Sequence, residues 1–236
     1  MSPRSPFKFT LLMGLLAVIF SSLGLWQLER KSEKAALFEA FANAPQMSLG
    51  DAVAAEQPFA QVRATGHYDS QRHFLLDNKI YEAQAGVHVL TPFTTLEGQV
   101  LLVNRGWKPL PPDRSTLPTI STPDIELPLY GRLNAPPQSG PKLGASDQLG
   151  EDQWPQLMTY FDLPAIETAL QKELLPWIVL LDADQPHGFV GRDWKPATMR
   201  PEMHGAYAFQ WFALAAAAVL IWGLRMFRPR RNAEKA

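Results

Sequence analysis

The sequence predicts a membrane protein of α and β structure. Two transmembrane helices are expected to flank a soluble domain that is mainly antiparallel β, built as a barrel or a sandwich. Two of the observations behind this are uncharged segments: 20 residues between Lys8 and Glu29, and 22 residues between Glu202 and Arg225. The third is the polar block between them, which contains short β-branched and aromatic runs at close spacing.

Each uncharged segment is long enough to cross a bilayer. At a helical rise of ~1.5 Å per residue, either one reaches ~30 Å, the thickness of the hydrocarbon core. The first segment also resembles a signal peptide, with small residues at positions 22 and 24, as in a small-x-small cleavage site. A signal core has only ~7–15 apolar residues, however, so the longer segment favours a retained anchor. We therefore divide the chain into a stub (1–8), a first span (9–28), a soluble domain (29–202), a second span (203–224) and a tail (225–236).

Basic residues predict the orientation of the two spans. The stub carries two basic residues and no acidic one, and the tail carries five basic residues against one acidic residue. The remaining 15 basic and 22 acidic residues give the middle of the chain a net charge of −7. The positive-inside rule therefore predicts that both termini lie in the cytoplasm. If the membrane is a bacterial inner membrane, the soluble domain then lies in the periplasm. The acidic domain gives no reason to expect nucleic-acid binding.

The soluble block begins with a helical pattern and continues with strands. Residues 31–44 have helical spacing and should prolong the first span as a stalk. A short helix is expected at 164–172, with Asp162 as its N-cap. The Pro-, Ser- and Gly-rich segments 109–123 and 135–155 predict long loops. Strands are expected at 60–68, 73–80, 87–94, 100–107, 127–133 and 177–181.

The sequence has no signature of an enzyme. There is no cysteine, which excludes disulfides, thiolate metal sites and a cysteine nucleophile. The nucleophile elbow, the phosphate-binding loop and the zinc-protease helix are also missing. His67, His73 and His88 lie on three expected strands and could together bind a metal, although unrelated strand histidines are more common. We expect a protein without catalytic residues.

The start of the second span carries the strongest functional pattern. His204, Tyr207, Ala208, Trp211 and Ala215 fall on one stripe of a helix with a 3.6-residue period. A histidine followed by aromatic rings and small residues is what a helix can offer to a haem: an axial imidazole, walls and room for a flat macrocycle. The stripe therefore predicts a haem site.

Charged residues near the spans could pair with haem propionates. Arg30, which shares a helix face with Trp26, and Arg200 are the two near the membrane boundary. Trp211 lies ~13 Å beyond Glu202 at helical rise, which is deep for an interfacial residue and favours helix packing or a ligand face.

Two other interpretations of this boundary stay open. In the first, Tyr207 and Trp26 belong to an interfacial aromatic belt, and His204 is a solvated residue at a helix start. In the second, Met199, Met203 and His204 form a thioether and imidazole site for copper(I).

Short blocks along the chain match a known family in content and order. They are LGLWQLERK (23–31), GHY (66–68), LLDN (75–78), GVHVLTP (86–92), LVNRGW (102–107), GRL (131–133), and His204 with YAFQWF (207–212). On these blocks the chain resembles the surfeit locus protein family of cytochrome c oxidase assembly factors. Residues 115–176 carry little of the resemblance.

The resemblance implies a protein that helps to insert haem a into oxidase subunit one. Its partners would be that subunit, the haem a synthesis machinery and the lipid bilayer. Bacterial members are described as binding haem a through a histidine at the start of the second span. The family usually has Asn and Leu around this histidine, where this chain has Met203 and Gly205. The expected cofactor-binding residues are His204 as the iron ligand, Tyr207 and Trp211 as walls, and Arg30 and Arg105 as propionate partners.

The alternative is a protein of another class, a membrane adaptor that stabilises partly assembled oxidase subunits without binding a cofactor. The two hypotheses differ in whether the isolated protein carries pigment. Residues 104–107, with the sequence Asn-Arg-Gly-Trp, are expected to end a strand in a fixed turn and to pack Trp107 at the membrane-facing rim.

Overall fold

The structure is a computed structural model that describes residues 6–137, 149–150, 153–196 and 198–227. The chain divides into two compact units, one formed by Met1–Ala42 and Pro196–Ala236 and the other by Asn43–Lys195. We call them the helical unit and the β unit and describe each by itself.

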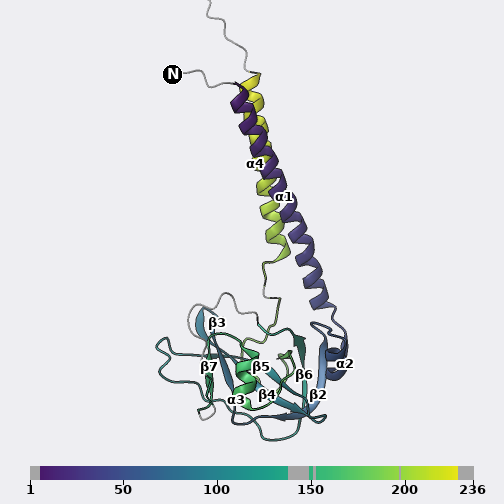
Figure 1. The fold of residues 1–236 in the computed structure, drawn as a ribbon, viewed down its shortest axis with the longest axis vertical. Helices are drawn as coiled ribbons and strands as arrows, with labels where there is room; N and C mark the ends of the chain where they lie inside the picture. The colour runs from purple at the N-terminus through teal and green to yellow at the C-terminus, as the bar shows by residue number, and fades with distance from the viewer. Residues whose placement is uncertain (1–5, 138–148, 151–152, 197, 228–236) are drawn as a thin grey trace, which may run out of the picture. The chain divides into compact units, whose positions relative to one another are not determined.

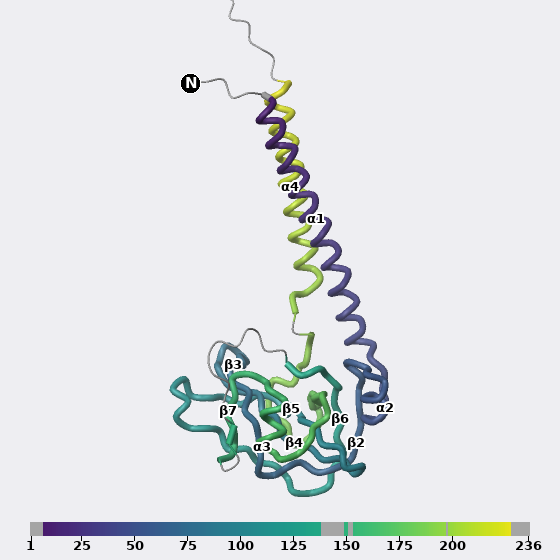
Figure 2. The backbone as a smooth tube through the Cα atoms, in the orientation of Figure 1, coloured from purple at the N-terminus to yellow at the C-terminus, as the bar shows by residue number. Residues whose placement is uncertain are grey.

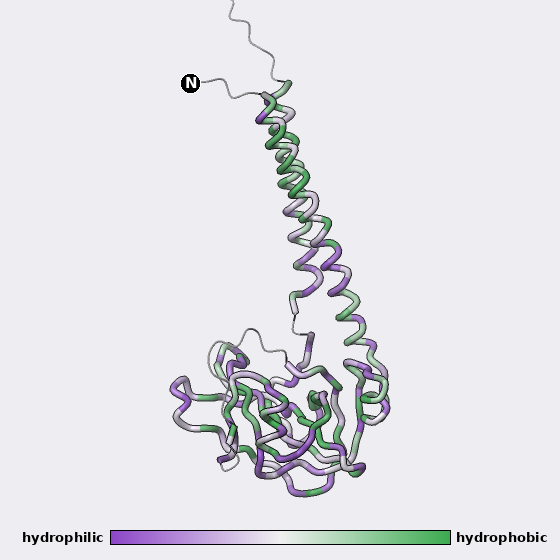
Figure 3. Tube along the Cα trace, viewed as in Figure 1, coloured by the Kyte–Doolittle hydropathy of each residue, from purple (hydrophilic) through white to green (hydrophobic). Residues whose placement is uncertain are grey.

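The helical unit contains two long helices, α1 (Pro6–Ala42) and α4 (Pro201–Met226), which lie side by side (Figure 1). Because α1 is continuous, the predicted stalk after the first span is confirmed. Both helices contain a segment long and apolar enough to cross a membrane, and Figure 3 shows these apolar stretches. Only 6% of that segment in α1 and 17% in α4 is buried, unlike the core helix of a soluble protein. The helices therefore fit a membrane protein.

The two helices are antiparallel and approach each other closely. Trp222 near the end of α4 donates from Nε1 to Thr10 Oγ1 near the start of α1, at 3.1 Å. Further along, Gly24 faces the ring of Phe212, and a Cβ added to this glycine would lie 2.6 Å from a ring carbon. A small residue at this crossing lets an aromatic ring pack directly on the α1 backbone.

The β unit is built around a closed barrel. Its eight strands follow the order β1-β2-β6-β8-β5-β4-β3-β7, and an additional pairing of β2 with β4 closes β2, β6, β8, β5 and β4 into a ring. Figures 1 and 2 trace the backbone of this unit. The strands are β1 (Gln46–Ser48), β2 (Gln61–Tyr68), β3 (Phe74–Tyr81), β4 (Gln84–Thr95), β5 (Val100–Pro109), β6 (Leu127–Asn134), β7 (Gln156–Met158) and β8 (Ile178–Leu181).

The six predicted strands are all present, and the barrel form of the prediction is confirmed. The sheet is mixed, however, because β1–β2, β3–β7 and β5–β8 pair in parallel. The helix α3 (Leu163–Leu170) is also confirmed, and Asp162 caps it by accepting from Ala165 N. The sequence did not reveal β1, β7 and the short helix α2 (Leu49–Ala54). These elements are too short to show a period.

The strand β5 is buried on both of its faces. Leu101 and Val103 point into one apolar cluster, and Leu102 between them points into another, which also holds Ile166 and Leu170 of α3. This division follows from the alternation of side chains along a strand. Because both faces are covered, the sequence of β5 begins with a continuous run of apolar residues, which is typical of such strands.

Residues 104–107 do not end a strand, as the sequence suggested, but lie inside β5. Trp107 is 5% exposed, and its Nε1 donates to Lys79 O at 3.0 Å. Gly106 takes a positive φ of +112°, and β5 pairs irregularly with β4 near His88. The kink in the backbone is therefore a bulge within the strand and not a terminal turn.

The predicted loop at 109–123 lies against the sheet. Leu117 and Ile120 pack on a third apolar cluster, and Arg114 Nε contacts Asp77 Oδ2 at 2.6 Å. The other predicted loop, at 135–155, falls largely outside the described residues.

Candidate functional site

His204 lies in the first turn of α4 and faces α1. Its side chain is buried, with 9% of the residue exposed, and Nδ1 lies 2.8 Å from Gln27 Oε1. A carboxamide oxygen only accepts hydrogen bonds, so this contact is a hydrogen bond in the tautomer that carries the proton on Nδ1. The other ring nitrogen, Nε2, is buried and has no hydrogen-bond partner among the described residues. A neutral imidazole with one nitrogen held in this way has a lone pair on the other, as metal-binding histidines do.

The predicted stripe forms the face with which α4 packs on α1. Ala208 and Ala215 are 2% and 8% exposed. Trp211 stacks on Phe20 of α1, with ring centroids 5.8 Å apart and an angle of 26° between the planes. Tyr207 is 41% exposed. The structure thus places Trp211 in helix packing and leaves Tyr207 accessible beside the buried face.

Arg30 lies three residues after Gln27, at the same end of the helix pair. It pairs through Nη1 with Glu33 Oε2 at 2.7 Å, and its side chain is 40% exposed. Its Nε is buried without a hydrogen-bond partner in the described structure. A guanidinium with unused donors near a membrane boundary can receive a carboxylate.

Unlike Arg30, Arg105 lies where it cannot receive a carboxylate from a ligand. This residue belongs to the β unit and has no exposed surface. It donates to His187 O from Nε at 2.8 Å and from Nη2 at 2.5 Å, and to Ser121 O from Nη2 at 3.0 Å. Nη1 donates to the hydroxyls of Thr122 and Thr91 at 2.5 and 3.4 Å. All five N–H groups are engaged, so the predicted propionate role is corrected to a structural one.

We expect Arg105→Met to lower the free energy of unfolding of the β unit by about 3 kcal/mol, because buried carbonyl groups lose their charged donor. Urea unfolding of the detergent-solubilised chain measures this change. Lys108→Met is the control, since Lys108 donates to Thr119 O at an exposed site, at 2.9 Å. It should cost less than about 1 kcal/mol. Equal costs for the two variants would contradict the interior role of Arg105.

The three strand histidines do not form a metal site. The described residues contain no group of three or more His, Asp or Glu side chains able to hold a metal ion. His67 is exposed, whereas His73 Nδ1 lies 3.2 Å from Thr91 Oγ1 and His88 Nδ1 lies 3.1 Å from Asn104 Nδ2. The three-histidine interpretation is therefore wrong. The copper(I) interpretation also gains no support, because Met199 and Met203 are 46% and 48% exposed while His204 is buried.

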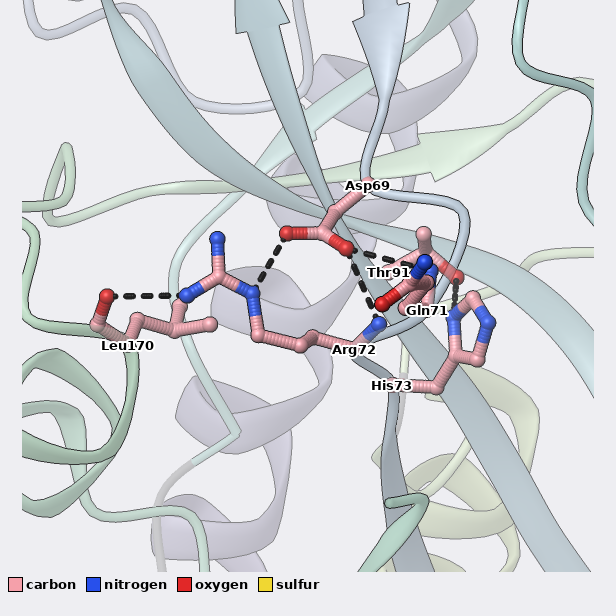
Figure 4. A network of polar contacts seen from close by, with 6 residues as sticks. All are labelled: Asp69, Gln71, Arg72, His73, Thr91 and Leu170. Atoms are coloured by element: carbon pink, nitrogen blue, oxygen red, sulfur yellow. Dashed lines mark hydrogen bonds and ion pairs between the residues drawn. The ribbon is translucent and has the colours of Figure 1, made fainter. Parts of the chain in front are cut away.

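The turn before His73 is held by a polar network, shown in Figure 4. Asp69 Oδ1 accepts from the backbone N–H groups of Gln71 and Arg72, at 3.1 and 2.9 Å. Arg72 Nε donates to Asp69 Oδ2 at 2.7 Å, and its Nη1 donates to Leu170 O at 3.1 Å. The network ties the β2–β3 turn to the end of α3 and fixes His73 in the interior.

Buried neutral histidines should make the β unit sensitive to acid. Burial, aided by the Arg105 charge, lowers the pKa of His73 to about 4, and burial followed by the Lys79 charge lowers the pKa of His88 to about 4. As the pH falls below the unfolded value of 6.5, the unfolded chain takes up protons first. Stability is complete above that pH and is lost toward pH 4, by up to about 1.4 kcal/mol per pH unit for each histidine.

Urea unfolding of the full chain between pH 7 and pH 5 checks this prediction. His73→Asn should reduce the slope of stability against pH. His67→Asn, at an exposed position, should leave it unchanged. A stability independent of pH in this range would show that the two interior histidines are not held neutral.

Comparison with known proteins gives the family. A profile described as "SURF1 family" matches residues 14–216. The chain belongs to the SURF1 family. "Surfeit locus protein 1" of Xenopus tropicalis is 27% identical over 245 residues, covering 92% of this chain and 75% of that protein. A "SURF1-like protein" of Rickettsia bellii is 27% identical over 238 residues, covering 91% and 88%.

Another "SURF1-like protein", from Rickettsia felis, is 31% identical over 105 residues, which cover 42% of this chain and 46% of that protein. This alignment thus spans less than half of either chain. The SURF1 family match begins within α1 and ends within α4, so it includes Gln27, Arg30 and His204.

Sequence reasoning named His204 and Arg30 in this SURF1 family member but missed Gln27. The signal was present, because Gln27 is a polar carboxamide inside an uncharged, mostly apolar segment. A polar side chain in a membrane helix usually faces another helix and finds a partner there.

Proposed function

We propose that this SURF1 family member is a cytochrome c oxidase assembly factor that binds haem a at the outer boundary of the membrane and assists its insertion into oxidase subunit one. The observation that carries the proposal is the state of His204. Its Nδ1 faces a carboxamide oxygen at 2.8 Å, and its buried Nε2 has no partner in the described structure. A nitrogen in this state has the unshared lone pair that an axial ligand for iron needs.

The surroundings of His204 suit a molecule that is apolar over most of its surface and anionic at one edge. Arg30 lies at the same end of the helix pair, and its Nε has no hydrogen-bond partner among the described residues. Tyr207, one turn beyond His204, offers an exposed aromatic ring. In this proposal Arg30 binds a propionate and Tyr207 covers part of the macrocycle, while Trp211 holds α4 against α1 through Phe20.

A carrier must also release its cargo. A single imidazole from one helix holds iron less firmly than a site with two axial histidines, so haem can move from the first to the second. The proposed orientation places both termini in the cytoplasm and His204 at the periplasmic surface, as the basic flanks predict. The proposed partners are oxidase subunit one, as acceptor, and the machinery that synthesises haem a, as donor.

The test is the colour of the purified protein. We would isolate the detergent-solubilised chain from cells that make haem a and from cells that make only protohaem, and record reduced-minus-oxidised spectra. A haem a band confined to the first preparation supports the carrier. A colourless protein from cells shown to contain haem a would reject it and leave the adaptor without a cofactor as the better hypothesis.

A further inference from the structure

We propose that Gln27 is the positioning residue for the iron ligand: its carboxamide oxygen holds His204 in the tautomer that is protonated at Nδ1 and bare at Nε2. The purpose of this arrangement rests on the proposed function. The tautomer itself is a property of the haem-free protein and can be measured without any ligand.

The contact joins the two helices of the unit. Gln27 Oε1 and His204 Nδ1 lie 2.8 Å apart although their residues are 177 positions apart in the chain. This distance is normal for an N–H donor and a carbonyl oxygen. Which ring nitrogen of a histidine bears the proton is set by the hydrogen bond that its neighbour makes. Gln27 is the side chain that makes this bond to His204.

The opposite tautomer is disfavoured at Nδ1. With the Gln27 carboxamide oriented as it is in the structure, a bare Nδ1 would place its lone pair against Gln27 Oε1 at 2.8 Å, so that two acceptors would face each other. At Nε2 neither tautomer finds a partner among the described residues, so the contact at Nδ1 decides between them. This contact favours the form in which Nε2 can coordinate a metal.

Contacts on either side keep Gln27 in register with His204. One turn earlier in α1, Gly24 lies against the ring of Phe212. One turn later, Lys31 approaches Gly205, since a Cβ added there would lie 3.5 Å from the lysine side chain. The carboxamide is therefore held between two helix–helix contacts. A supporting residue on a rigid element is what a preorganised ligand needs.

The first experiment measures the tautomer in the haem-free full chain. The protein has 5 histidines, so ¹⁵N-histidine labelling gives few signals, and the spectrum of His204→Ala identifies those of His204. At pH 8 we expect a protonated Nδ1 and a bare Nε2. Gln27→Leu should convert the signals to a mixture or to the Nε2–H form, whereas Gln27→Glu, which keeps an acceptor, should retain the wild-type form.

The matched control is Thr10→Val, which removes the hydrogen bond to Trp222 near the other end of the helix pair. It loses an interhelical bond without touching His204, so the His204 signals should not change. An Nε2–H form in the wild type, or identical His204 spectra in the wild type and Gln27→Leu, would overturn the proposal.

The second experiment measures how tightly the wild type and the variants bind haemin. Loss of a hydrogen-bond partner behind a metal-bound histidine typically weakens binding by about 10- to 100-fold, and we expect this for Gln27→Leu. Gln27→Glu should bind haemin and lower its midpoint potential, because a carboxylate makes the imidazole a stronger electron donor to the iron.

Equal losses of haemin affinity in Gln27→Leu and Thr10→Val would show a general effect of helix pairing and reject the positioning role. A wild type that binds no haemin would reject the proposed function, while the tautomer measurement would still decide the role of Gln27.

Discussion

Gly106→Val is expected to remove most of the folded protein from the membrane. A Cβ at this position would lie 2.7 Å from both Phe189 O and Val190 O, closer than such atoms approach. The same residue has a φ of +112°, which a β-branched side chain does not tolerate. Neither problem can be relieved locally, because Phe189 N bonds to Arg105 O at 2.6 Å and Trp107 N bonds to Val190 O at 2.7 Å.

The expected cost of Gly106→Val exceeds about 3 kcal/mol, a large share of the 5–15 kcal/mol that stabilises an ordinary domain. Immunoblots of membranes measure abundance, and haem content per folded molecule shows whether binding changes separately. Gly98→Val is the control for the backbone strain alone, since Gly98 also has a positive φ of +83° but nothing lies within 4 Å of its added Cβ; it should lower abundance less than Gly106→Val does. Normal abundance of Gly106→Val with lost oxidase activity would mean that this glycine serves function and not folding.

Much of the fold could be predicted because it depends on local patterns. The long spans, the strands of the barrel and the Asp162 cap all have signals within about ten residues of sequence. The bulge at Gly106 was missed because a run such as Val-Asn-Arg-Gly-Trp is compatible with either a strand end or an irregular strand interior. The parallel pairs, among them β5 with β8, depend on long connections that leave no mark on either strand.

The site was only partly predictable for a related reason. A 3.6-residue stripe identifies the face that carries His204, but it does not say what that face meets. The partner, Gln27, lies on a helix at the other end of the chain. For Arg105, in contrast, the sequence suggested a ligand contact that the structure does not support. Its charge and its place in a recognised motif suggested a ligand contact, whereas its complete burial and its bonds to Ser121 and His187 show a structural role.

His204→Ala is expected to abolish the haem a band of the purified protein while leaving its abundance close to that of the wild type. The variant loses the nitrogen proposed to bind iron but only one interhelical hydrogen bond, to Gln27. Such bonds between membrane helices contribute only about 0.6 kcal/mol on average. The packing of Ala208, Ala215 and Trp211 on α1 is unaffected, so the helix pair should persist.

Reduced-minus-oxidised spectra, normalised to protein, measure this loss. His67→Ala is the matched control, because it removes an exposed histidine of the β unit and should keep the full band. Imidazole added to His204→Gly should restore haem binding if the side chain acts only as a ligand, since the free base can occupy the same space. Full haem occupancy in His204→Ala would contradict the assignment of His204 as the iron ligand. The ligand would then have to be sought among His67, His73 and His88.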